Sequence, residues 1–137
     1  MSSSIVNIYY SFGFRFQEDA NKIIEHIKTR LIGLEENFKI RIPKQFKPVN
    51  TGKGEFFFSD LYQLYSSDIL ISYIPEPTAG AICELAMFKT KYPTRCAIGV
   101  HCMEHDWIQW LLDYNFTEAN ALDIASDTLK SLILNML

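Results

Sequence analysis

Hydrophobic and polar residues follow two different spacings along this chain, and the spacing switches back and forth. Short apolar or alternating runs rich in β-forming residues predict strands over 4–10, 37–43, 68–74 and 95–100. Apolar residues at helical spacing predict helices over 17–32, 57–67, 80–91 and 104–113, followed by a final amphipathic helix that Thr117 would cap. The pattern therefore predicts strands and helices that alternate along the chain.

This alternation is typical of a three-layer, doubly wound α/β sandwich of the Rossmann-like or flavodoxin-like kind. We expect a single domain over 1–137 with a mostly parallel sheet of about four or five strands. The run 37–43 alternates apolar with basic residues, which places it near a sheet edge. Parallel sheets bind ligands at the carboxyl ends of their strands. Four loops follow the predicted strands there, after Tyr10, Ile42, Ile74 and Val100.

The composition narrows the class of protein. The 137 residues are 48% hydrophobic and 21% charged, which is enough apolar material for a packed core. Thirteen basic and sixteen acidic residues give a net charge of −3, so no basic surface favours a nucleic-acid duplex. Charges interrupt every apolar run before the roughly 20 residues of a membrane span, and 1–4 lacks the features of a signal peptide. We expect a cytoplasmic protein without a membrane segment, whose three cysteines are reduced.

Glu84 has unusual neighbours for a charged residue. Apolar side chains surround it in the sequence, namely Ala81, Ile82, Cys83, Leu85, Ala86, Met87 and Phe88. A carboxyl buried among such neighbours would have a raised pKa unless hydrogen-bond donors stabilise its ionised form, and perturbed carboxyls cluster at functional sites. The alternative is that Glu84 lies on the solvent face of its helix or pairs with Lys89 or Lys91.

Four motifs with a fixed order surround this glutamate. They are a first strand that ends in Ile8-Tyr9-Tyr10, a helix aspartate at Asp60, a strand introduced by Asp68, and the helix start Gly80-Ala81-Ile82-Cys83-Glu84. Asp60 and Asp68 are 8 residues apart (68 − 60 = 8). In order and spacing these parts resemble the nucleoside 2-deoxyribosyltransferase superfamily, which includes the 2′-deoxynucleoside 5′-phosphate N-hydrolases. The resemblance extends along almost the whole chain.

The resemblance implies an enzyme that breaks an N-glycosidic bond without a metal or an organic cofactor. Glu84 would attack C1′ of the sugar and form a covalent glycosyl-enzyme, because a carboxylate is the natural partner of an oxocarbenium-like centre. Asp60 would protonate or hydrogen-bond the departing base, and Tyr9 would orient Glu84. For Tyr9, the structural alternative is core packing with its hydroxyl satisfied elsewhere.

The resemblance also suggests which residues bind the substrate. Thr78 and Gly80 lie at the start of the helix that carries Glu84, where a hydroxyl and free backbone N–H groups favour an anion. Ser11, Gly13 and Arg15 share the loop expected after the first strand, where Arg15 would supply a charge and Gly13 a close backbone approach. The phosphate hydrolases of the family resemble this chain in having a hydroxyl at the place of Thr78. The structural alternatives are a helix cap for Thr78 and a solvated cation for Arg15.

Two further groups of residues have less specific patterns. The cysteine and histidine types that bind zinc occur at Cys96, His101, Cys102 and His105, but the spacing matches no known ligand set, and we expect no metal site. Phe57 and Phe58 flank Asp60 and would sandwich a base. The helical spacing of Trp107 and Trp110 favours the core or a subunit interface.

The sequence thus favours an N-glycosidase for 2′-deoxynucleoside 5′-monophosphates or nucleosides, assembled as a homo-oligomer. Base exchange by a transferase is an alternative, although the chain ends in an amphipathic helix where the transferases have a short aromatic tail. A catalytically silent nucleotide sensor is another, supported mainly by Ile82, which stands where relatives often keep a small residue. Ala86 stands where they often keep glycine, and the two departures together would change the shape of the pocket and allow a changed substrate. Cleavage of the nicotinamide bond of NAD is a third.

Overall fold

The computed structural model describes residues 5–43 and 55–137, so the surface loop that the sequence predicts over 44–54 lies outside the described residues. The strands are β1 (Val6–Phe12), β2 (Phe38–Arg41), β3 (Ile69–Tyr73), β4 (Cys96–Val100) and β5 (Tyr114–Phe116). A 3-10 turn, η1 (Phe14–Phe16), precedes the helices α1 (Gln17–Arg30), α2 (Glu55–Tyr65), α3 (Ala79–Lys91), α4 (Asp106–Leu111) and α5 (Ala121–Met136). Within the described ranges, no helix is both long and apolar enough to cross a bilayer.

The strands form one parallel sheet with the order β2-β1-β3-β4-β5. This confirms the doubly wound α/β prediction, and the order is that of flavodoxin-like folds. β2 lies at an edge of the sheet, as its alternation of apolar and basic residues predicts. From β1 the chain turns to β2 on one side and later to β3 on the other. The strand order therefore reverses between β1 and β3, where such folds open a crevice at the carboxyl ends of the strands.

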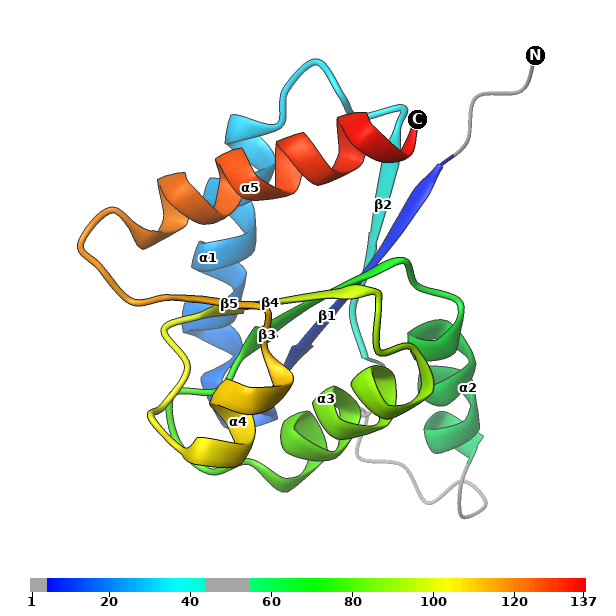
Figure 1. Cartoon of the computed structure of the whole chain (residues 1–137), viewed down its shortest axis with the longest axis vertical. Coiled ribbons are helices and arrows are strands. Elements are labelled where there is room, and N and C mark those ends of the chain that lie inside the picture. The colour runs from blue at the N-terminus through cyan, green and yellow to red at the C-terminus, as the bar shows by residue number, and fades with distance from the viewer. Residues whose placement is uncertain (1–4, 44–54) are drawn as a thin grey trace.

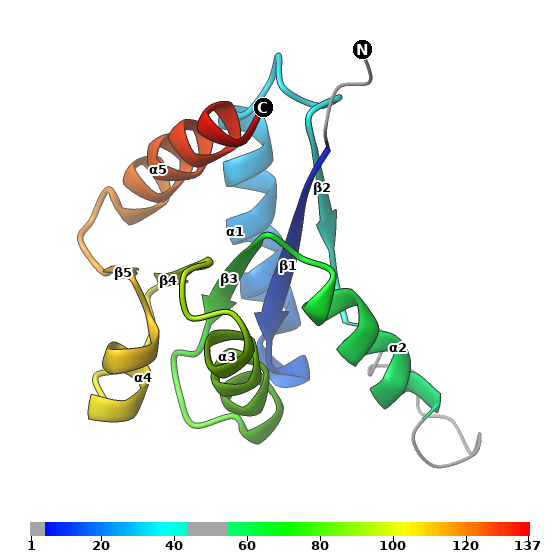
Figure 2. The same cartoon turned by 45° about the vertical axis from the view of Figure 1, so that its right-hand side comes forward.

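Helices cover both faces of the sheet, as Figure 1 and Figure 2 show. α1 and α5 pack on the face that carries Ile8, Tyr10 and Phe12 of β1. α2, α3 and α4 pack on the opposite face, which carries Tyr9 of β1, Leu70 of β3 and Ala97 of β4. Side chains alternate between the faces of a strand, so Tyr9 and Ser11 both point to the side of α3.

Some element boundaries differ from the sequence prediction. Ser11 and Phe12 belong to β1 and not to a loop, because they pair with Ser72 and Tyr73 of β3 and so extend the strand. The prediction that Thr117 caps the last helix is wrong, since α5 begins at Ala121 with Asn120 in the N-cap position. The segment before it instead pairs with β4 as β5, which the sequence analysis missed because three residues are too few for a recognisable alternation.

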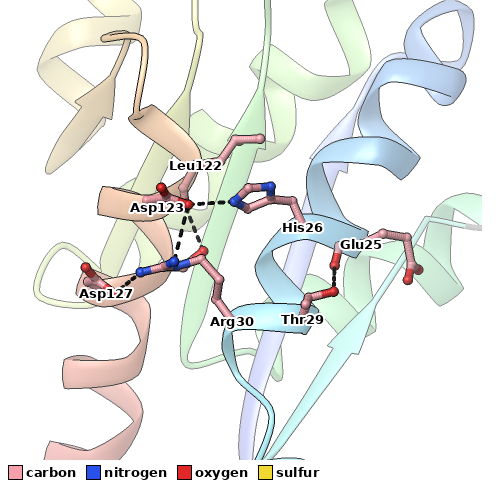
Figure 3. A network of polar contacts seen from close by, with 8 residues as sticks. Glu25, His26, Thr29, Arg30, Leu122, Asp123 and Asp127 are labelled. Atoms are coloured by element: carbon pink, nitrogen blue, oxygen red, sulfur yellow. Dashed lines mark hydrogen bonds and ion pairs between the residues drawn. The ribbon is translucent and has the colours of Figure 1, made fainter.

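Charged side chains join α1 to α5 on the outer surface of their layer (Figure 3). His26 Nε2 lies 2.7 Å from Asp123 Oδ1, and Arg30 lies 3.5 Å from Asp123 and 3.2 Å from Asp127. The hydrogen bond from His26 is the main cause of a lowered pKa at Asp123, and the charge of Arg30 lowers it further. These groups are partly exposed to solvent, so we expect the network to orient α5 against α1 and to add little stability.

Asp123→Asn should lower the urea midpoint of unfolding at neutral pH, because the amide loses the charge that His26 and Arg30 stabilise. A carboxyl with a lowered pKa adds stability above its ordinary pKa of about 4 and loses it as the pH falls through the lowered value. The difference from the wild type should therefore narrow in acid. Asp127→Asn is the matched control: Asp127 contacts Arg30, and its substitution should lower the urea midpoint by a smaller amount. Equal effects at every pH would contradict this account.

Candidate active site

A cleft of about 390 Å³ opens between α2 and α3, on the side of the sheet that Tyr9 and Ser11 face. Its wall is mostly apolar and contains two carboxylates. The α2 part of the wall is Asp60, Leu61 and Leu64, and the α3 part is Ala79, Gly80, Cys83, Glu84 and Met87. Gly80, Cys83, Glu84 and Met87 recur at helical spacing and therefore lie on one face of α3. This face forms one side of the cleft.

Both carboxylate oxygens of Glu84 accept hydrogen bonds from β1. The Tyr9 hydroxyl donates to Oε2, and the Ser11 hydroxyl donates to Oε1 over 2.8 Å. Tyr9 and Ser11 are fully buried, so these two donors are held in place by the sheet. Each carboxylate oxygen has two lone pairs. The β1 hydroxyls therefore hold the Glu84 carboxylate in place, and its remaining lone pairs can contact a ligand in the cleft.

Burial is the main influence on this carboxyl group and raises the pKa of Glu84 to about 7. The hydrogen bonds from Tyr9 and Ser11 oppose the rise, and the negative charge of Asp60 adds to it. Burial and the nearby Glu84 carboxylate also raise the pKa of Tyr9 far above its ordinary value, so Tyr9 stays a hydrogen-bond donor. The carboxyl group thus changes its charge near neutral pH, which suits acid, base or nucleophilic chemistry.

The two aspartates of the sequence motif have different places. Asp60 is 8% exposed and lines the cleft, and its charge acts on both Glu84 and Tyr9. Asp68 lies at the other end of the sheet, where its Oδ2 accepts from the Asn7 N–H over 2.8 Å and its own N–H donates to the Asn7 carbonyl over 2.7 Å. Asp60 belongs to the candidate site, whereas Asp68 joins the starts of β1 and β3.

Of the residues expected to bind a substrate, Gly80 lies in the cleft wall and Ser11 lies beneath it. Gly13 and Thr78 instead pack against each other beside the cleft, since a Cβ on Gly13 would lie 2.5 Å from the Thr78 methyl carbon. Thr78 occupies the N-cap position of α3, but its hydroxyl donates to the Glu76 carbonyl over 3.1 Å and does not cap the helix.

Arg15 lies outside the cleft wall. Its guanidinium is 2.9 Å from the Glu76 carboxylate, and both side chains are largely exposed. Together with the Gly13 and Thr78 contact, this ion pair holds the loop after β1 against the loop after β3. A phosphate that reached Arg15 would have to compete with Glu76.

The pairing alternative for Glu84 is wrong, because neither lysine reaches it, and the solvent-face alternative is wrong because the carboxylate accepts hydrogen bonds from Tyr9 and Ser11 of β1. Lys89 Nζ lies 2.8 Å from Asp113, and Lys91 lies over the ring of Tyr65. Ile82 also differs from expectation, since it faces a second cavity, between α3 and α4, and does not narrow the cleft of Glu84.

Phe58, one of the two aromatic residues expected to sandwich a base, does not line the cleft. Phe58 is 67% exposed and outside its wall, and the side chain of Phe57 lies outside the described residues. The core interpretation is wrong for Trp107 and Trp110, which are 68% and 75% exposed. They lie on α4, on the far side of α3 from Glu84.

The cysteine and histidine cluster is not assembled into a ligand set. In 5–43 and 55–137, no group of three or more His, Cys, Asp or Glu side chains is placed to hold a metal ion. Cys102 is buried, its thiol donates to the Ser72 carbonyl over 3.2 Å, and burial raises its pKa to about 11. A thiol that stays protonated behaves as a small core residue.

The sequence analysis missed several residues of this region. Among the cleft residues, Leu64 follows Asp60 at helical spacing, and Cys83 and Met87 follow Gly80 at helical spacing, so this spacing was the available signal. Arg41 is the other omission. It ends β2, pairs in register with Tyr9 on the same face of the sheet, and has a buried Nε that forms no hydrogen bond with any residue of 5–43 and 55–137. A cation with an unused donor thus stands one strand away from Tyr9.

No family model matches this chain, and no curated protein does. Solved structures do share its fold. A 2-deoxyribosyltransferase from the psychrotolerant bacterium Bacillus psychrosaccharolyticus is 18% identical, with a TM-score of 0.62 over 91% of this chain and 90% of that one. A conserved protein from Enterococcus faecalis V583 is 14% identical, with a TM-score of 0.58 over 98% and 100%.

A response regulator receiver domain from Clostridium thermocellum is also similar, at 10% identity and a TM-score of 0.51 over 97% of this chain and 99% of that one. At these identities the likeness is one of fold. The fold of this chain is thus shared by a deoxyribosyltransferase and by a signalling domain, and the choice of function rests on the side chains of the cleft.

Glu84→Gln should make the protein more stable than the wild type above neutral pH. A carboxyl with a raised pKa adds its full stability below about pH 4.5 and loses it as the pH rises through about 7. The amide carries no charge to bury, its oxygen accepts from one of the two β1 hydroxyls, and its NH2 group donates to the other. Urea unfolding at pH 8 should favour the variant by on the order of 1–3 kcal/mol more than at pH 4.5.

Glu118→Gln, at an exposed position, is the control and should show no such pH dependence. A constant difference between Glu84→Gln and the wild type from pH 4.5 to pH 8 would mean that the Glu84 carboxyl titrates alike in the folded and unfolded chains.

Proposed function

We propose that this protein is an N-glycosidase that cleaves the bond between base and sugar in a small 2′-deoxynucleoside 5′-monophosphate or nucleoside. The observation that carries the proposal is the Glu84 carboxyl group, which lines a cleft beside Asp60 while both of its oxygens are held by hydroxyls of β1. An oriented carboxylate with a second acid nearby is what glycoside cleavage with a covalent intermediate requires.

In the first step, a Glu84 oxygen forms a bond to C1′ while the bond from C1′ to the base nitrogen breaks. The electron pair goes to the base, which takes a proton from the protonated form of Asp60; in this form Asp60 adds no negative charge beside Glu84. In the second step, the Asp60 carboxylate takes a proton from water as the water oxygen bonds to C1′ and the ester bond to Glu84 breaks. The sugar leaves, and both carboxyl groups return to their starting states. No cofactor enters this sequence.

Three features favour Glu84 as the nucleophile over a purely structural role. Burial keeps water away from its carboxylate, which makes the charge more reactive. The Tyr9 hydroxyl stays protonated beside Glu84. Its hydrogen bond would stabilise the Glu84 carboxylate while this group loses its negative charge during attack. The apolar walls from Leu61, Leu64 and Met87 suit the face of a base, and Asp60 in the same wall supplies its polar contact.

The alternatives use the same site. A transferase would admit a second base in place of water, and cleavage of NAD would use the same carboxylate. The sensor alternative relied on a cleft narrowed by Ile82, and that side chain faces away from the cleft. We further propose that the protein acts in the cytoplasm as a homo-oligomer, for which the exposed Phe58 and Tyr62 of α2 offer an apolar contact surface.

Recognition of a 5′-phosphate would use the two arginines near the ends of β1 and β2. Arg41 has an unused buried Nε donor, whereas Arg15 is engaged by Glu76. A phosphate would satisfy the Arg41 donor without breaking an existing ion pair. We therefore propose Arg41 as the main phosphate contact, with Arg15, Thr78 and Gly13 as a second group at the neighbouring strand end.

Glu84→Gln should abolish release of free base from every substrate, because an amide oxygen is too weak a nucleophile to displace the base. Activity of the wild type should rise with pH through about 7, since only the ionised carboxylate attacks. Chromatography of reactions with deoxynucleosides, their monophosphates and NAD measures the base released. Release only when a second base is added would indicate the transferase.

Cys83→Ser provides the matched control in the same wall and should keep turnover within about tenfold of the wild type. Unchanged turnover by Glu84→Gln would reject the nucleophile assignment. If no substrate released a base although nucleotides bound tightly, the sensor alternative would replace the enzyme.

Arg41→Gln should raise KM for deoxynucleoside monophosphates about tenfold and leave KM for the nucleosides unchanged, because only the phosphate loses a charged partner. Arg15→Gln should have a smaller effect, since Glu76 already occupies that guanidinium. Steady-state kinetics on matched pairs of nucleoside and nucleotide measure both. An equal rise in KM for both substrates in Arg41→Gln would contradict a role in phosphate recognition.

A further inference from the structure

Two adjoining cavities open beside α4, on the opposite side of α3 from the Glu84 cleft. The first has a volume of about 460 Å³ and is lined by Glu104, His105, Asp106, Trp107 and Trp110. The second has a volume of about 300 Å³ and is lined by Pro77, Ile82, Met103, His105, Trp107 and Ile108. His105 and Trp107 border both cavities, so the two cavities adjoin, and together they are called here the α4 site.

The two indoles of the α4 site are exposed although tryptophan is among the most costly side chains to leave in water. Trp107 is 68% exposed and Trp110 is 75% exposed. They are three residues apart on α4, and Asp106 is four residues before Trp110, so the three side chains share one helix face. The first cavity thus places a carboxylate and two aromatic rings around the same space.

His105 is held in a defined orientation between the cavities. Its Nδ1 accepts a hydrogen bond from the Trp107 backbone N–H over 3.2 Å. A nitrogen that accepts carries no proton, so the proton of the neutral ring is on Nε2. The His105 ring therefore has a fixed orientation next to the Trp107 indole.

The charges of the α4 site are unbalanced. Glu104 and Asp106 are both exposed and form no ion pair within the described part of the chain. Asp106 offsets the partial positive charge at the amino end of α4, which leaves Glu104 without a compensating group. Indole faces attract cations, and carboxylates beside them add to the attraction. The first cavity is complementary to a positive charge.

The second cavity has a different chemistry. Ile82, Met103 and Ile108 give it an apolar floor, and Pro77 closes one end. A group placed there would gain from leaving water and would need no polar partner. The α4 site as a whole thus combines a cation-binding half with an apolar half, separated by the Trp107 ring.

We propose that the α4 site binds a small organic cation that carries an apolar group. Its ammonium head lies against Trp107 and Trp110 near Glu104, and its apolar group enters the cavity floored by Ile82 and Ile108. This binding is independent of the Glu84 chemistry, because α3 separates the two sites.

Tryptophan fluorescence reports on the α4 site alone, because the chain has only two tryptophans and both line it. Titration with benzyltrimethylammonium should change the emission saturably, with a Kd on the order of 1 mM. Tetramethylammonium should bind more weakly, because it leaves the apolar half empty. Choline should bind about tenfold more tightly than 3,3-dimethylbutan-1-ol, its uncharged isostere.

Variants distinguish binding at the α4 site from binding elsewhere on the surface. Trp110→Leu and Glu104→Gln should each weaken binding several-fold, with Trp107 as the remaining reporter in the first. Glu84→Gln should leave binding unchanged, and Tyr62→Leu is the control for an exposed aromatic residue outside the site. A thermal unfolding midpoint equal to that of the wild type shows that a variant keeps its fold.

Equal affinity for choline and its uncharged isostere would overturn the proposal, because charge would then play no part. So would the absence of a saturable change with any of these cations. Sedimentation at the same protein concentrations covers the remaining case: if the chain self-associates and Trp110→Leu makes it monomeric, the face is a subunit interface and the proposal fails.

Discussion

The contact between Glu84 and β1 connects the fold of this protein to its proposed chemistry. A carboxyl group on α3 is removed from most of the surrounding water and receives two hydroxyl hydrogen bonds from Tyr9 and Ser11 in return. Those hydroxyls are available only because β1 is an interior strand of a parallel sheet and presents alternate residues to the α3 face. Where the strand order reverses, α2 and α3 leave room above the carboxylate, and the cleft forms there.

A carboxyl group in such surroundings lowers the free energy of unfolding above neutral pH, because its charged form is poorly solvated. An apolar residue at the same position would not have this cost. Leu or Met would fill the same volume without desolvating a charge. On the neighbouring strand, the Ser72 hydroxyl is also buried, beside Ser11, and no residue that the structure describes forms a hydrogen bond with it. Polar groups on this otherwise apolar face are thus concentrated beneath Glu84, as expected where stability is given up for function.

Much of this arrangement could be predicted from the sequence, and the reasons are local. Strand and helix spacing identified every α-helix and every strand except β5, and the apolar neighbours of Glu84 indicated its burial. The contact of Ser11 with Glu84 could not be predicted, because it depends on β1 continuing two residues beyond Tyr10 through pairing with β3. The ion pair of Arg15 with Glu76 depends on how two loops meet. The exposure of Trp107 and Trp110 depends on α4 being short and lying at the side of α3, where spacing alone suggested burial.

The central claim is that Glu84 is a buried, hydrogen-bonded carboxyl group that changes its charge near neutral pH. Its side-chain carboxyl carbon can be followed by 13C NMR as a function of pH, with the signal assigned by its loss in Glu84→Gln. The account predicts a midpoint of about 7, which rises when Tyr9→Phe removes a stabilising hydrogen bond. A midpoint near 4.5, the ordinary value for glutamate, would contradict it.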